Sequence, residues 1–527
     1  MHGHFGLTLT GEGIVYEDLE RRISLVWTDH GMTPGRTSLA ESSRFIVDHY
    51  CRRPDAFPEN LPGSFAIALY DAGRQRRLLA RDAFGTIPLY YAPAAGRDTR
   101  FGTRIAHVLD ELSETRLNPA ALLDFLTFFW ALDGKTFFRG VELLPQGSVW
   151  DNGQVRRYFT FKHRPEERPR KEWVSAIRDA LTQAVQATLA DDLGCHLSGG
   201  VDSSAVTMLA TQLRGAPPPA FVAEFPDSVP AGEAQYGQLV ADSIGAELIR
   251  VFAGPERFPE ALSAIVRAVE EPKCHPPVFP RFLIESEAKT RGCRVLLTGR
   301  GADEIFTGYE WHRAETLTRS QARRTVFTAE DRAALLRPEF LSAADYSPAE
   351  AYEAILADCA GGSDLERIMA LDARTILANW LVIDYKISGH FQNECRAPFL
   401  DTNLVNLGLS IPARQKIEGD RLKALLKDAV ADILPAAVLD RPKIGFRTPM
   451  GEMMRLGLKD YMRDALAADS SPFWEVFNPD GAALLLERHF VRGENLGWQL
   501  WALLSIREWF RAFVDRQRPR ETGDRNA

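Results

Sequence analysis

The sequence of 527 residues contains few cysteines and no long apolar run. Its six cysteines are widely scattered, and no two of them form a CxxC pair, so we expect neither a disulfide framework nor a zinc site. They are Cys51, Cys195, Cys274, Cys293, Cys359 and Cys395. No segment reaches the roughly 20 apolar residues that a membrane-spanning helix needs, and the first residues lack the pattern of a secretory signal. We therefore expect a cytoplasmic protein in a reducing compartment, with no membrane partner.

An excess of basic residues is also missing. Lys and Arg number 63 against 71 for Asp and Glu, which gives a net charge of -8 and no reason to expect a nucleic-acid partner. Hydrophobic residues make up 45% and charged residues 25%, values typical of soluble folded chains. At roughly 150 residues per domain, the length predicts two to four domains. No internal repeat is present.

The first 160 residues predict a β-rich domain. Short apolar runs bounded by turn residues predict strands at 65–70, 77–81 and 87–91. Between 162 and 171 almost every residue is Arg, Lys, Pro or Glu, which is typical of a solvated linker. We therefore place one domain at 1–160 and a second at 171–515, followed by a polar tail at 516–527.

The second domain alternates strands and helices. Apolar residues recur at helical spacing over 173–189. One strand-like run then ends at Leu197, and three more lie at 221–225, 248–252 and 294–297. This alternation predicts a doubly wound parallel sheet, and helices dominate from about residue 315 onward. The fold class is therefore α/β, with a helical carboxy-terminal part.

A Ser/Gly-rich segment at 197–204 has the composition of a phosphate-binding loop. Its members include Leu197, Ser198, Gly199, Gly200, Asp202, Ser203 and Ser204. Glycines let backbone amides approach an anion, the serine hydroxyls can donate hydrogen bonds, and the following helix adds positive potential at its start. Asp202 would repel a phosphate unless a cation lay between them, so its presence implies Mg²⁺. The alternative is a structural Ser/Gly turn capped by Asp202.

Another loop follows the next predicted strand, at 297–304. Because the carboxyl ends of parallel strands share one edge of a sheet, Asp303 in this loop could face Asp202 across a metal ion. The alternative is an ordinary loop with an acidic helix start. Further along, Lys423 and Lys443 stand in short polar segments, where an isolated lysine is usually solvated.

Taken together, these segments resemble the asparagine synthetase family. Its SGGxDSS and TGxGADE loops match 198–204 and 298–304, a segment ending in PFLD matches 396–401, and the PKxGF lysine is Lys443. Residues 63–71 and 81–91 are similar to the end of the family's glutaminase domain. The resemblance implies an amino-terminal-nucleophile-type, glutaminase-like domain followed by a PP-loop ATP pyrophosphatase domain.

The resemblance also implies a reaction and its cofactors. ATP would adenylate a carboxylate, an amine would attack the acyl adenylate, and AMP and pyrophosphate would leave. Residues 197–204 together with Gly299 would bind the nucleotide, and Asp202 and Asp303 would hold Mg²⁺. Lys423 and Lys443 match family lysines that contact the phosphates and the developing oxyanion.

The sequence departs from the family at its start and in the second loop. Glutamine-using members begin Met-Cys-Gly, but here His2 replaces the thiol nucleophile and the stretch before Gly63 is short. We therefore expect no glutaminase activity and interpret the first domain as a degenerate, retained scaffold. Arg300 stands where asparagine synthetases carry glutamate and β-lactam synthetases carry tyrosine, and an arginine cannot take a proton from the amine. Arg300 could instead clamp a substrate carboxylate, or it could lie in a surface ion pair.

Two further positions bear on the missing base. His275 replaces an aspartate of the family's DEPxxDP segment, and it could be the base or a hydrogen-bonded wall of the pocket. Residues 385–388 stand where β-lactam synthetases carry the glutamate partner of their tyrosine, so both members of that dyad are expected to be missing. An α-amino group, with a pKa near 8, needs a base less than a side-chain amine does.

These departures favour an amide ligase of natural-product biosynthesis whose amine comes from a source other than glutamine. The best match is a lasso peptide cyclase, which joins an Asp or Glu side chain of a precursor peptide to the peptide's amino terminus in a macrolactam. The alternatives are an ammonia-dependent asparagine synthetase, then a β-lactam synthetase, then an inactive ATP-binding scaffold. The expected partners are a small-molecule or peptide carboxylate, and for a lasso pathway a precursor peptide and a protease; the chain could also form a homodimer.

Overall fold

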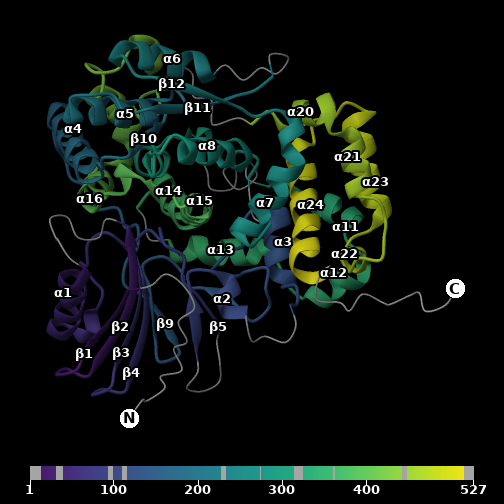
Figure 1. Cartoon of the computed structure of the whole chain (residues 1–527), viewed down its shortest axis with the longest axis horizontal. Helices are drawn as coiled ribbons and strands as arrows, with labels where there is room; N and C mark the ends of the chain where they lie inside the picture. The colour runs from purple at the N-terminus through teal and green to yellow at the C-terminus, as the bar shows by residue number, and fades with distance from the viewer. Residues whose placement is uncertain are drawn as a thin grey trace.

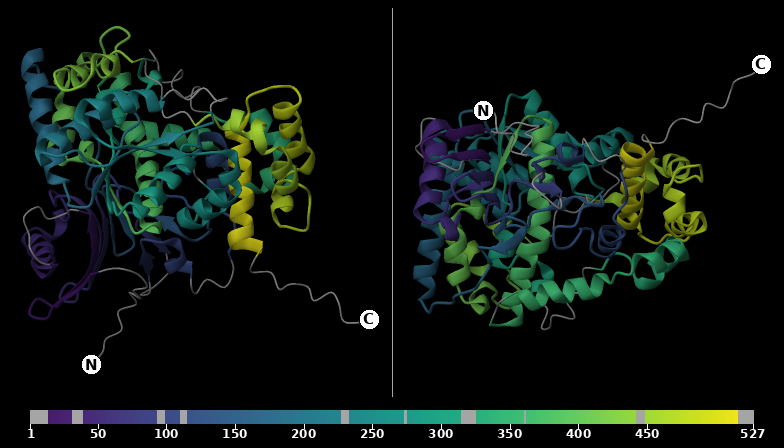
Figure 2. Two further views of the ribbon diagram at one scale, coloured as in Figure 1. Left: turned by 45° about the horizontal axis from the view of Figure 1, so that its top comes forward. Right: turned by 90° about the horizontal axis from the view of Figure 1, so that it is seen from below.

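The computed structural model describes residues 14–30, 39–92, 99–109, 115–226, 233–272, 275–313, 325–359, 362–441 and 448–515. Figures 1 and 2 show the amino-terminal sheets and the carboxy-terminal helices at opposite ends of the molecule, joined by a region of mixed helices and strands. Within the described ranges, none of the helices combines the length and the apolarity that crossing a bilayer requires. The mixed α/β fold class is confirmed.

The amino-terminal part contains two antiparallel sheets. The larger has the strand order β1-β2-β3-β4-β8-β9 and the smaller has the order β6-β5-β7. The strands of the larger sheet are β1 (Ile14–Asp18), β2 (Ile23–His30), β3 (Ser64–Asp71), β4 (Arg76–Arg81), β8 (Ser148–Asp151) and β9 (Gln154–Arg157). Those of the smaller are β5 (Tyr90–Ala92), β6 (Arg100–Gly102) and β7 (Glu142–Leu143).

Strand β3 reads as a nearly continuous apolar run because both of its faces are covered. Ile67 and Leu69 point toward the helix α1 (Leu39–Arg52), whose Ile46 and Val47 share one apolar cluster with them. On the other face, the small side chain of Ala66 belongs to a second cluster of buried residues. A strand with one exposed face alternates apolar and polar residues, whereas β3 is apolar over most of its length because both of its faces are buried.

The strand expected at 87–91 starts only at Tyr90. Pro88 has no amide hydrogen to donate to a neighbouring strand. The preceding carbonyl oxygen, that of Ile87, accepts a hydrogen bond from Arg81 Nε at 2.8 Å. The first half of the apolar run is therefore buried without joining a sheet.

A five-stranded parallel sheet forms the second part, in the order β12-β11-β10-β13-β14. Its strands are β10 (Leu193–His196), β11 (Ala220–Glu224), β12 (Leu248–Phe252), β13 (Val295–Leu297) and β14 (Glu394–Arg396). Helices α4 (Arg170–Ala187), α5 (Val201–Arg214) and α6 (Glu233–Ile244) gather on one side of the sheet in Figure 1, and α7 (Phe258–Val269), α8 (Val278–Thr290) and α15 (Ala378–His390) on the other. Strand β14 was not predicted from the sequence, because this short edge strand has no apolar run to reveal it.

The strand order creates a crevice at one point of the sheet. From β10 the chain proceeds outward to β11 and β12, and it then returns to place β13 on the other side of β10. The loops that leave β10 and β13 therefore diverge, and ligands of open α/β sheets bind at such switch points. The predicted 197–204 and 298–304 loops follow these two strands directly.

Short and long helices complete the carboxy-terminal part. They are α9 (Ala302–Phe306), α11 (Ala329–Leu335), α12 (Pro338–Ala344), α13 (Pro348–Asp358), α14 (Asp364–Asp372), α16 (Thr402–Ser410), α17 (Ala413–Lys416), α18 (Ala424–Ala429), α19 (Ala436–Leu439), α20 (Met450–Gly457), α21 (Lys459–Ala465), α22 (Phe473–Val476), α23 (Pro479–Phe490) and α24 (Gly497–Trp509). Helix α24 lies beside the amino-terminal helix α3 (Pro119–Phe128). The other amino-terminal helix in this region is α2 (Ile105–Leu109).

Two acidic residues join the amino-terminal part to the parallel-sheet part. The Glu270 carboxylate accepts hydrogen bonds from the amides of Ile105 and Ala106 at 3.0 and 2.9 Å. The Glu271 carboxylate accepts one from the amide of Phe137 at 3.0 Å. Both acids come from the DEPxxDP-like segment, so this segment anchors the two parts to each other as well as bordering the cavity.

The predicted linker has exposed side chains between 164 and 169, and α4 begins at Arg170. Its backbone is not free, because the amides of Arg164 and Glu166 donate to the carbonyls of Leu409 and Ser410. The boundaries 1–160 and 171–515 stay predictions, and the tail at 516–527 lies outside the described residues.

Candidate active site

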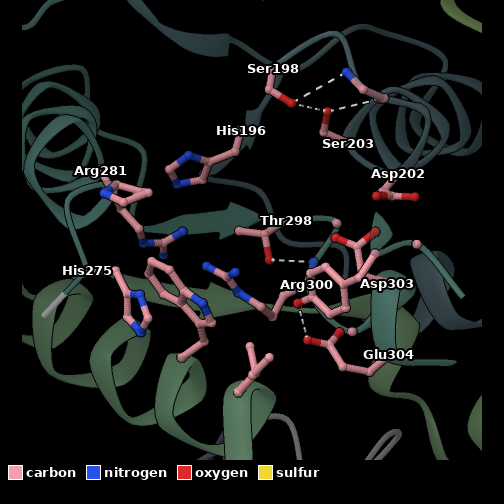
Figure 3. A pocket seen from close by; sticks show the side chains of 18 of the residues that line it. His196, Ser198, Asp202, Ser203, His275, Arg281, Thr298, Arg300, Asp303 and Glu304 are labelled. Atoms are coloured by element: carbon pink, nitrogen blue, oxygen red, sulfur yellow. Dashed lines mark hydrogen bonds between the residues drawn. The ribbon is translucent and has the colours of Figure 1, made fainter. Parts of the chain in front are cut away.

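A cavity of about 730 Å³ opens at the switch point of the parallel sheet. The loops after β10 and β13 border it, together with residues from α15, α18 and α24 and from the amino-terminal part. Figure 3 shows Ser198, Ser203 and Asp202 on one side of this space and His275 and Arg281 on another, with Arg300 between them. The cavity therefore has a hydroxyl- and acid-lined end and a second end bordered by rings.

The loop after β10 has the geometry of an anion site. Gly199 adopts φ +71°, and a Cβ atom there would lie 2.4 Å from the amide nitrogen of Gly237, so only glycine fits. Gly200 precedes α5 with no side-chain capping hydrogen bond, so the amides of the first helical turn are available to an anion. Ser198 Oγ and Ser203 Oγ lie 3.2 Å apart at the cavity edge.

Not all predicted members of this loop reach the cavity. Leu197, Ser198, Gly200, Asp202 and Ser203 line it. Gly199 and Ser204 are not among the lining residues. Ser204 is completely buried and its Oγ has no hydrogen-bond partner among the described residues, so its contact with a phosphate stays a prediction. Ser204 lies one residue further into α5, on the side of the helix that packs against the protein interior.

Lys423 joins the two predicted metal ligands. Its Nζ lies 2.5 Å from Asp202 Oδ2 and also forms an ion pair with Asp303 Oδ1. Burial lowers the pKa of the Lys423 ammonium, but the two carboxylates raise it more, so the net shift is upward. The loop can come this close to α5 because residue 299 is glycine: a Cβ atom there would lie 2.6 Å from Asp202 Cβ.

The acids fit a magnesium site that is completed by phosphate. Asp202 Oδ1 is buried and has no hydrogen-bond partner among the described residues. No group of three or more His, Cys, Asp or Glu side chains suited to a metal was found in the same ranges. Mg²⁺ commonly takes only one or two protein carboxylates and fills its other positions with water and substrate phosphates. Asp202 and Asp303 would therefore hold it only together with a nucleotide.

Arg300 forms a largely buried ion pair rather than a surface one. Its Nε and Nη2 donate to the Asp384 carboxylate at 2.9 and 3.3 Å, and its guanidinium lies 4.4 Å from the centre of the Trp380 ring. Asp384 is 2% exposed and also lies 3.1 Å from Nε of Arg281. Burial lowers the pKa of Arg300, but the charge and hydrogen bond of Asp384 together with the charge of Glu304 raise it more, so this side chain stays charged.

The acid that pairs with Arg300 directly precedes the segment 385–388. Within that segment, Lys386 donates to Glu270 at 2.8 Å and Ser388 donates to Glu285 at 2.9 Å, and neither lines the cavity. The salt bridge between Arg300 and Asp384 therefore lies just before this segment and not within it. A permanently charged arginine and its carboxylate make no proton-transfer dyad.

His275 is stacked among aromatic rings. Its ring centre lies 5.1 Å from Phe129, 5.6 Å from Trp130 and 5.1 Å from Trp380, at interplanar angles of 24 to 27°. Burial lowers the pKa of His275 to about 3, with a further contribution from the charge of Arg300. A neutral imidazole of such low basicity is a poor general base, so the geometry favours the pocket wall over the base.

Several residues in or beside the cavity were not singled out from the sequence. Asp384, Trp380 and Phe129 have no motif that could have revealed them, because they come from distant segments. Glu304 was noted only as part of its loop, yet it is 3% exposed and accepts a hydrogen bond of 2.6 Å from Tyr309 Oη. Burial, with the charge of Asp303, raises the pKa of Glu304 to about 7.

Two predicted site residues cannot be placed. Lys443 lies in the segment 442–447 and His2 in the segment 1–13, both outside the described residues. The expected oxyanion role of Lys443 and the expected loss of glutaminase activity therefore stay predictions. Arg441, just before the first segment, lines the cavity and donates to the Ser198 carbonyl at 3.2 Å.

Comparisons with known proteins match both parts of the chain. Residues 176–511 match the asparagine synthase family model, and residues 3–160 match a glutamine amidotransferase domain. A putative glutamine-hydrolyzing asparagine synthetase of Mycobacterium tuberculosis is 27% identical over 96% of this chain and 84% of that protein. The glutamine-hydrolyzing asparagine synthetase 1 of Bacillus subtilis is 22% identical over 96% of this chain and 85% of that protein. Among solved structures, an NMN synthetase from Francisella tularensis matches with a TM-score of only 0.20 and 19% identity, over 27% of this chain and 59% of that one.

Proposed function

The chain belongs to the asparagine synthase family of AMP-forming carbon–nitrogen ligases, and we propose that it adenylates an Asp- or Glu-type carboxylate and couples it to an amine that does not come from glutamine. Its specific reaction, on this proposal, is macrolactam formation within a peptide, as in lasso peptide biosynthesis. The observation that carries the proposal is the ion pair of Arg300 with Asp384 beside the cavity.

That ion pair supports an amine that is already partly neutral. Arg300 cannot accept a proton, and neither nitrogen of a His275 with a pKa of about 3 is an effective base near neutral pH. An α-amino group, with a pKa near 8, is partly neutral in the cell, whereas a lysine-type amine near 10.4 is not. Glu304, with a pKa of about 7, already accepts a hydrogen bond from Tyr309 Oη, so the amino terminus of a peptide fits this site better than a side-chain amine does.

The residues at the other end of the cavity suit the first step. A carboxylate oxygen of the substrate attacks the α-phosphorus of ATP, the bond to the bridging oxygen breaks, and pyrophosphate leaves. The amides at the start of α5, with Ser198 and Ser203, are placed to bind the departing pyrophosphate. Mg²⁺, when held by Asp202 and Asp303, would neutralise phosphate charge.

In the second step the amine nitrogen attacks the acyl carbon, and the bond to the AMP oxygen breaks. Lys423, fixed between Asp202 and Asp303, keeps a positive charge next to the phosphates in both steps. The nitrogen loses its remaining extra proton to solvent or to the departing phosphate oxygen. The products are an amide, AMP and pyrophosphate.

An ammonia-dependent asparagine synthetase is the second candidate. The relatives named above are asparagine synthetases, and the loops 297–309 and 394–401 keep close to that family's pattern. A β-lactam synthetase ranks third, because Arg300 and residues 385–388 supply neither member of its tyrosine–glutamate dyad. An inactive ATP-binding scaffold ranks last, since Asp202, Asp303 and Lys423 form a complete charged cluster at the cavity.

The test measures AMP release and analyses the products by mass spectrometry, with Mg-ATP at pH 8. One reaction contains aspartate with ammonium chloride, a second contains aspartate with glutamine, and a third contains a peptide with a free amino terminus and an internal Asp or Glu. Loss of one water from the peptide, together with AMP, is the expected result.

The other outcomes decide between the alternatives. Asparagine formed with ammonium but not with glutamine identifies the ammonia-dependent synthetase. Asparagine formed with glutamine refutes the expected loss of glutaminase activity. ATP binding without AMP across a broad set of acids and amines favours the scaffold. For a lasso pathway, genes for a small precursor peptide and a protease should lie next to this gene.

A further inference from the structure

We propose that the end of the cavity beyond Arg300 is a subsite for an aromatic ring of the carboxylic-acid substrate, and that the amino-terminal domain builds one wall of it. This inference rests on the proposed adenylation of a carboxylate. It also gives the amino-terminal domain a role that needs no glutaminase activity.

Five ring-bearing side chains from distant segments form this subsite. All of them line the cavity, and they are Phe129, Trp130, His275, Trp380 and Trp498. Trp498 meets Phe129 edge-on at 5.4 Å and His275 at 6.1 Å, whereas the other contacts of His275 are nearly parallel. Walls of this kind can offer both ring faces and ring edges, the two surfaces that a further aromatic ring prefers.

The wall from the amino-terminal domain is held in an uncommon backbone conformation. Phe129 follows α3 with φ +70°, in the left-handed region, and its amide donates to the Phe125 carbonyl at 2.8 Å. Non-glycine residues, and bulky ones above all, seldom adopt this conformation, and such positions cluster at binding sites. The turn directs the chain so that Phe129 and Trp130 both reach the cavity.

An unpartnered polar atom points to a ligand in the same place. His275 is 7% exposed and lines the cavity, but its Nε2 has no hydrogen-bond partner among the described residues. Buried polar atoms are usually satisfied, so an orphan at a cavity wall indicates a group that a bound molecule supplies. A substrate that stacks in this subsite can supply it with one polar group at the ring or on its linker.

Charge balance favours a ring over a second anionic group. Arg300 lies 4.4 Å from the Trp380 ring centre, so the subsite adjoins the loop that carries Asp303. Because Asp384 and Glu285 together compensate Arg300 and Arg281, this end of the cavity offers no uncompensated positive charge from these two side chains. A compact dicarboxylic acid such as aspartate gains little there, whereas an aromatic group gains apolar and stacking contacts.

The ring has two sources that share this chemistry. It can belong to an aromatic residue next to the activated Asp or Glu of a peptide, or to a free aryl-substituted carboxylic acid. Both sources place a ring a few bonds away from the carboxylate that is adenylated.

The first experiment uses ATP–pyrophosphate exchange by the full-length protein, because this reaction needs only the acid. The peptide arm compares N-acetyl-Asp-Phe-amide with N-acetyl-Asp-Leu-amide, and the free-acid arm compares 4-phenylbutyrate with hexanoate. We expect kcat/KM to be roughly 5-fold or more higher for the aromatic member of at least one pair. Equal values within both pairs overturn the inference, and the arm that shows the preference identifies the source.

A second experiment tests the wall residues against a matched control. Phe129→Leu and Trp130→Leu should bring the ratio of aromatic to aliphatic kcat/KM close to one, with the KM for ATP unchanged. Phe137→Leu removes an equally buried ring of the same domain that does not line the cavity, so it should keep the wild-type ratio. The ratio of aromatic to aliphatic kcat/KM does not depend on how much of a variant is folded. If both wall variants keep the wild-type ratio, Phe129 and Trp130 do not form the wall of the subsite.

Failure of the proposed function can be told apart from failure of this inference. Exchange with the aliphatic acids and no preference for a ring refutes the subsite alone. If no acid supports exchange, adenylation itself fails, and calorimetric binding of 4-phenylbutyrate to the wild-type protein then decides on the subsite. The subsite is supported if 4-phenylbutyrate binds and the Trp130→Leu variant binds it roughly 5-fold or more weakly than the wild type does. The absence of binding overturns the subsite.

Discussion

Arg300 and Lys423 are two cations that face the same cavity, and each is held by carboxylates from other elements. Asp384 on α15 holds Arg300, and Asp202 and Asp303 hold Lys423. Removing one partner of a buried ion pair costs more than the pair itself contributes, because the remaining charge stays buried without compensation. We therefore expect these carboxylates to contribute to stability.

The first prediction concerns Asp384, which compensates Arg300 and Arg281 together. Replacement Asp384→Asn keeps the shape of the side chain but leaves Arg300 beside Arg281, which then has only Glu285 among the described residues as its partner in an ion pair. We expect a loss of about 3 kcal/mol in the free energy of unfolding, measured as the shift in denaturant midpoint. AMP formation should fall as well, because Arg300 loses its orientation.

A double-mutant cycle provides the control. Arg300→Met removes one of the two arginines, so Asp384→Asn should cost less in that background than in the wild type, with a coupling of about 1 kcal/mol or more. Additive effects of the two substitutions would contradict the ion pair as the cause.

The second prediction comes from the sequence and concerns Lys443. A lysine aimed at charge that develops in the transition state is worth several kcal/mol in a dry site. We expect Lys443→Ala to reduce amide formation by roughly 10²-fold or more while leaving ATP binding largely intact. Turnover and nucleotide binding are measured separately, and near-normal product formation by this variant would refute the role.

At the scale of elements, the loop after β13 lies very close to α5, and this brings Asp303 near Asp202 and Lys423. A Cβ atom on Gly299 would lie 2.6 Å from Asp202 Cβ and 2.9 Å from the amide nitrogen of Ser203. These contacts involve the backbone of α5, so they cannot be relieved by a side-chain rotation. The loop and the helix would have to move apart.

The third prediction follows from this contact. Gly299→Ala should reduce AMP formation by roughly 10²-fold, because a shift of about 1 Å between reacting groups is enough for such a loss. The matched control is Gly389→Ala, since Gly389 lies in α15 and a Cβ atom there would meet nothing within 4 Å. That substitution should leave activity unchanged and stabilise the protein by about 0.5–1 kcal/mol. Equal activity of both variants would show that the close approach is not needed.

Lys416 at the end of α17 connects two elements near the cavity. It is 1% exposed, and its Nζ donates to the Ile305 carbonyl in α9 at 2.9 Å. Burial lowers the pKa of Lys416 to about 7 from the usual 10.5. Between these two values the unfolded chain holds a proton that the folded chain lacks.

The fourth prediction is that the free energy of unfolding changes with pH because of Lys416. Stability rises with pH where the unfolded state binds more protons, so Lys416 should make the protein more stable as the pH rises from 7 to 10.5. The slope from this residue is at most about 1.4 kcal/mol per pH unit, and Lys416→Met removes it. Unfolding midpoints of wild type and variant are compared from pH 7 to 10. A constant difference over that range would contradict the lowered pKa.

In the whole molecule, the largest apolar cluster spans both parts of the chain, and two smaller clusters lie around the amino-terminal strands. A single cluster of buried residues includes Phe125 and Phe138 from the amino-terminal part and Trp509 from α24. Trp509 meets Phe138 at 5.1 Å, and Glu270 and Glu271 accept backbone hydrogen bonds from the amino-terminal part. The boundary that we placed in the sequence therefore separates two sequence regions that pack as one body.

The fifth prediction is that the second part does not fold well alone. A fragment that starts at residue 162 exposes the apolar surface around Trp509 and leaves the buried carboxylates of Glu270 and Glu271 without their amide donors. We expect an insoluble or partly unfolded fragment, whereas the full chain melts in a single transition. Size-exclusion chromatography and thermal unfolding of both proteins check this. A soluble, cooperatively melting fragment would refute it.

The local pattern of residues was enough to predict the motifs and the elements around them. Residues 198–204 are recognisable because an anion site needs glycines, hydroxyls and a helix start in immediate succession along the chain. Residues 298–304 are recognisable because an acidic loop directly follows another predicted strand of the same sheet. Alternating strand and helix patterns likewise predicted β11, β12 and the parallel sheet. Local sequence failed where no local signal exists: β14 is too short and polar, and Pro88 delays β5 to Tyr90.

The partners of the predicted residues depend on packing between distant segments. The sequence located Arg300, but its partner Asp384 is 84 residues away, and whether the ion pair is exposed or buried depends on how α15 packs against the sheet. Similarly, the rings around His275 come from α24, α15 and the amino-terminal part, which no spacing relates to one another. Short-range chemistry is encoded in consecutive residues, whereas charge compensation and cavity walls arise only when the folded chain brings remote side chains within a few ångströms.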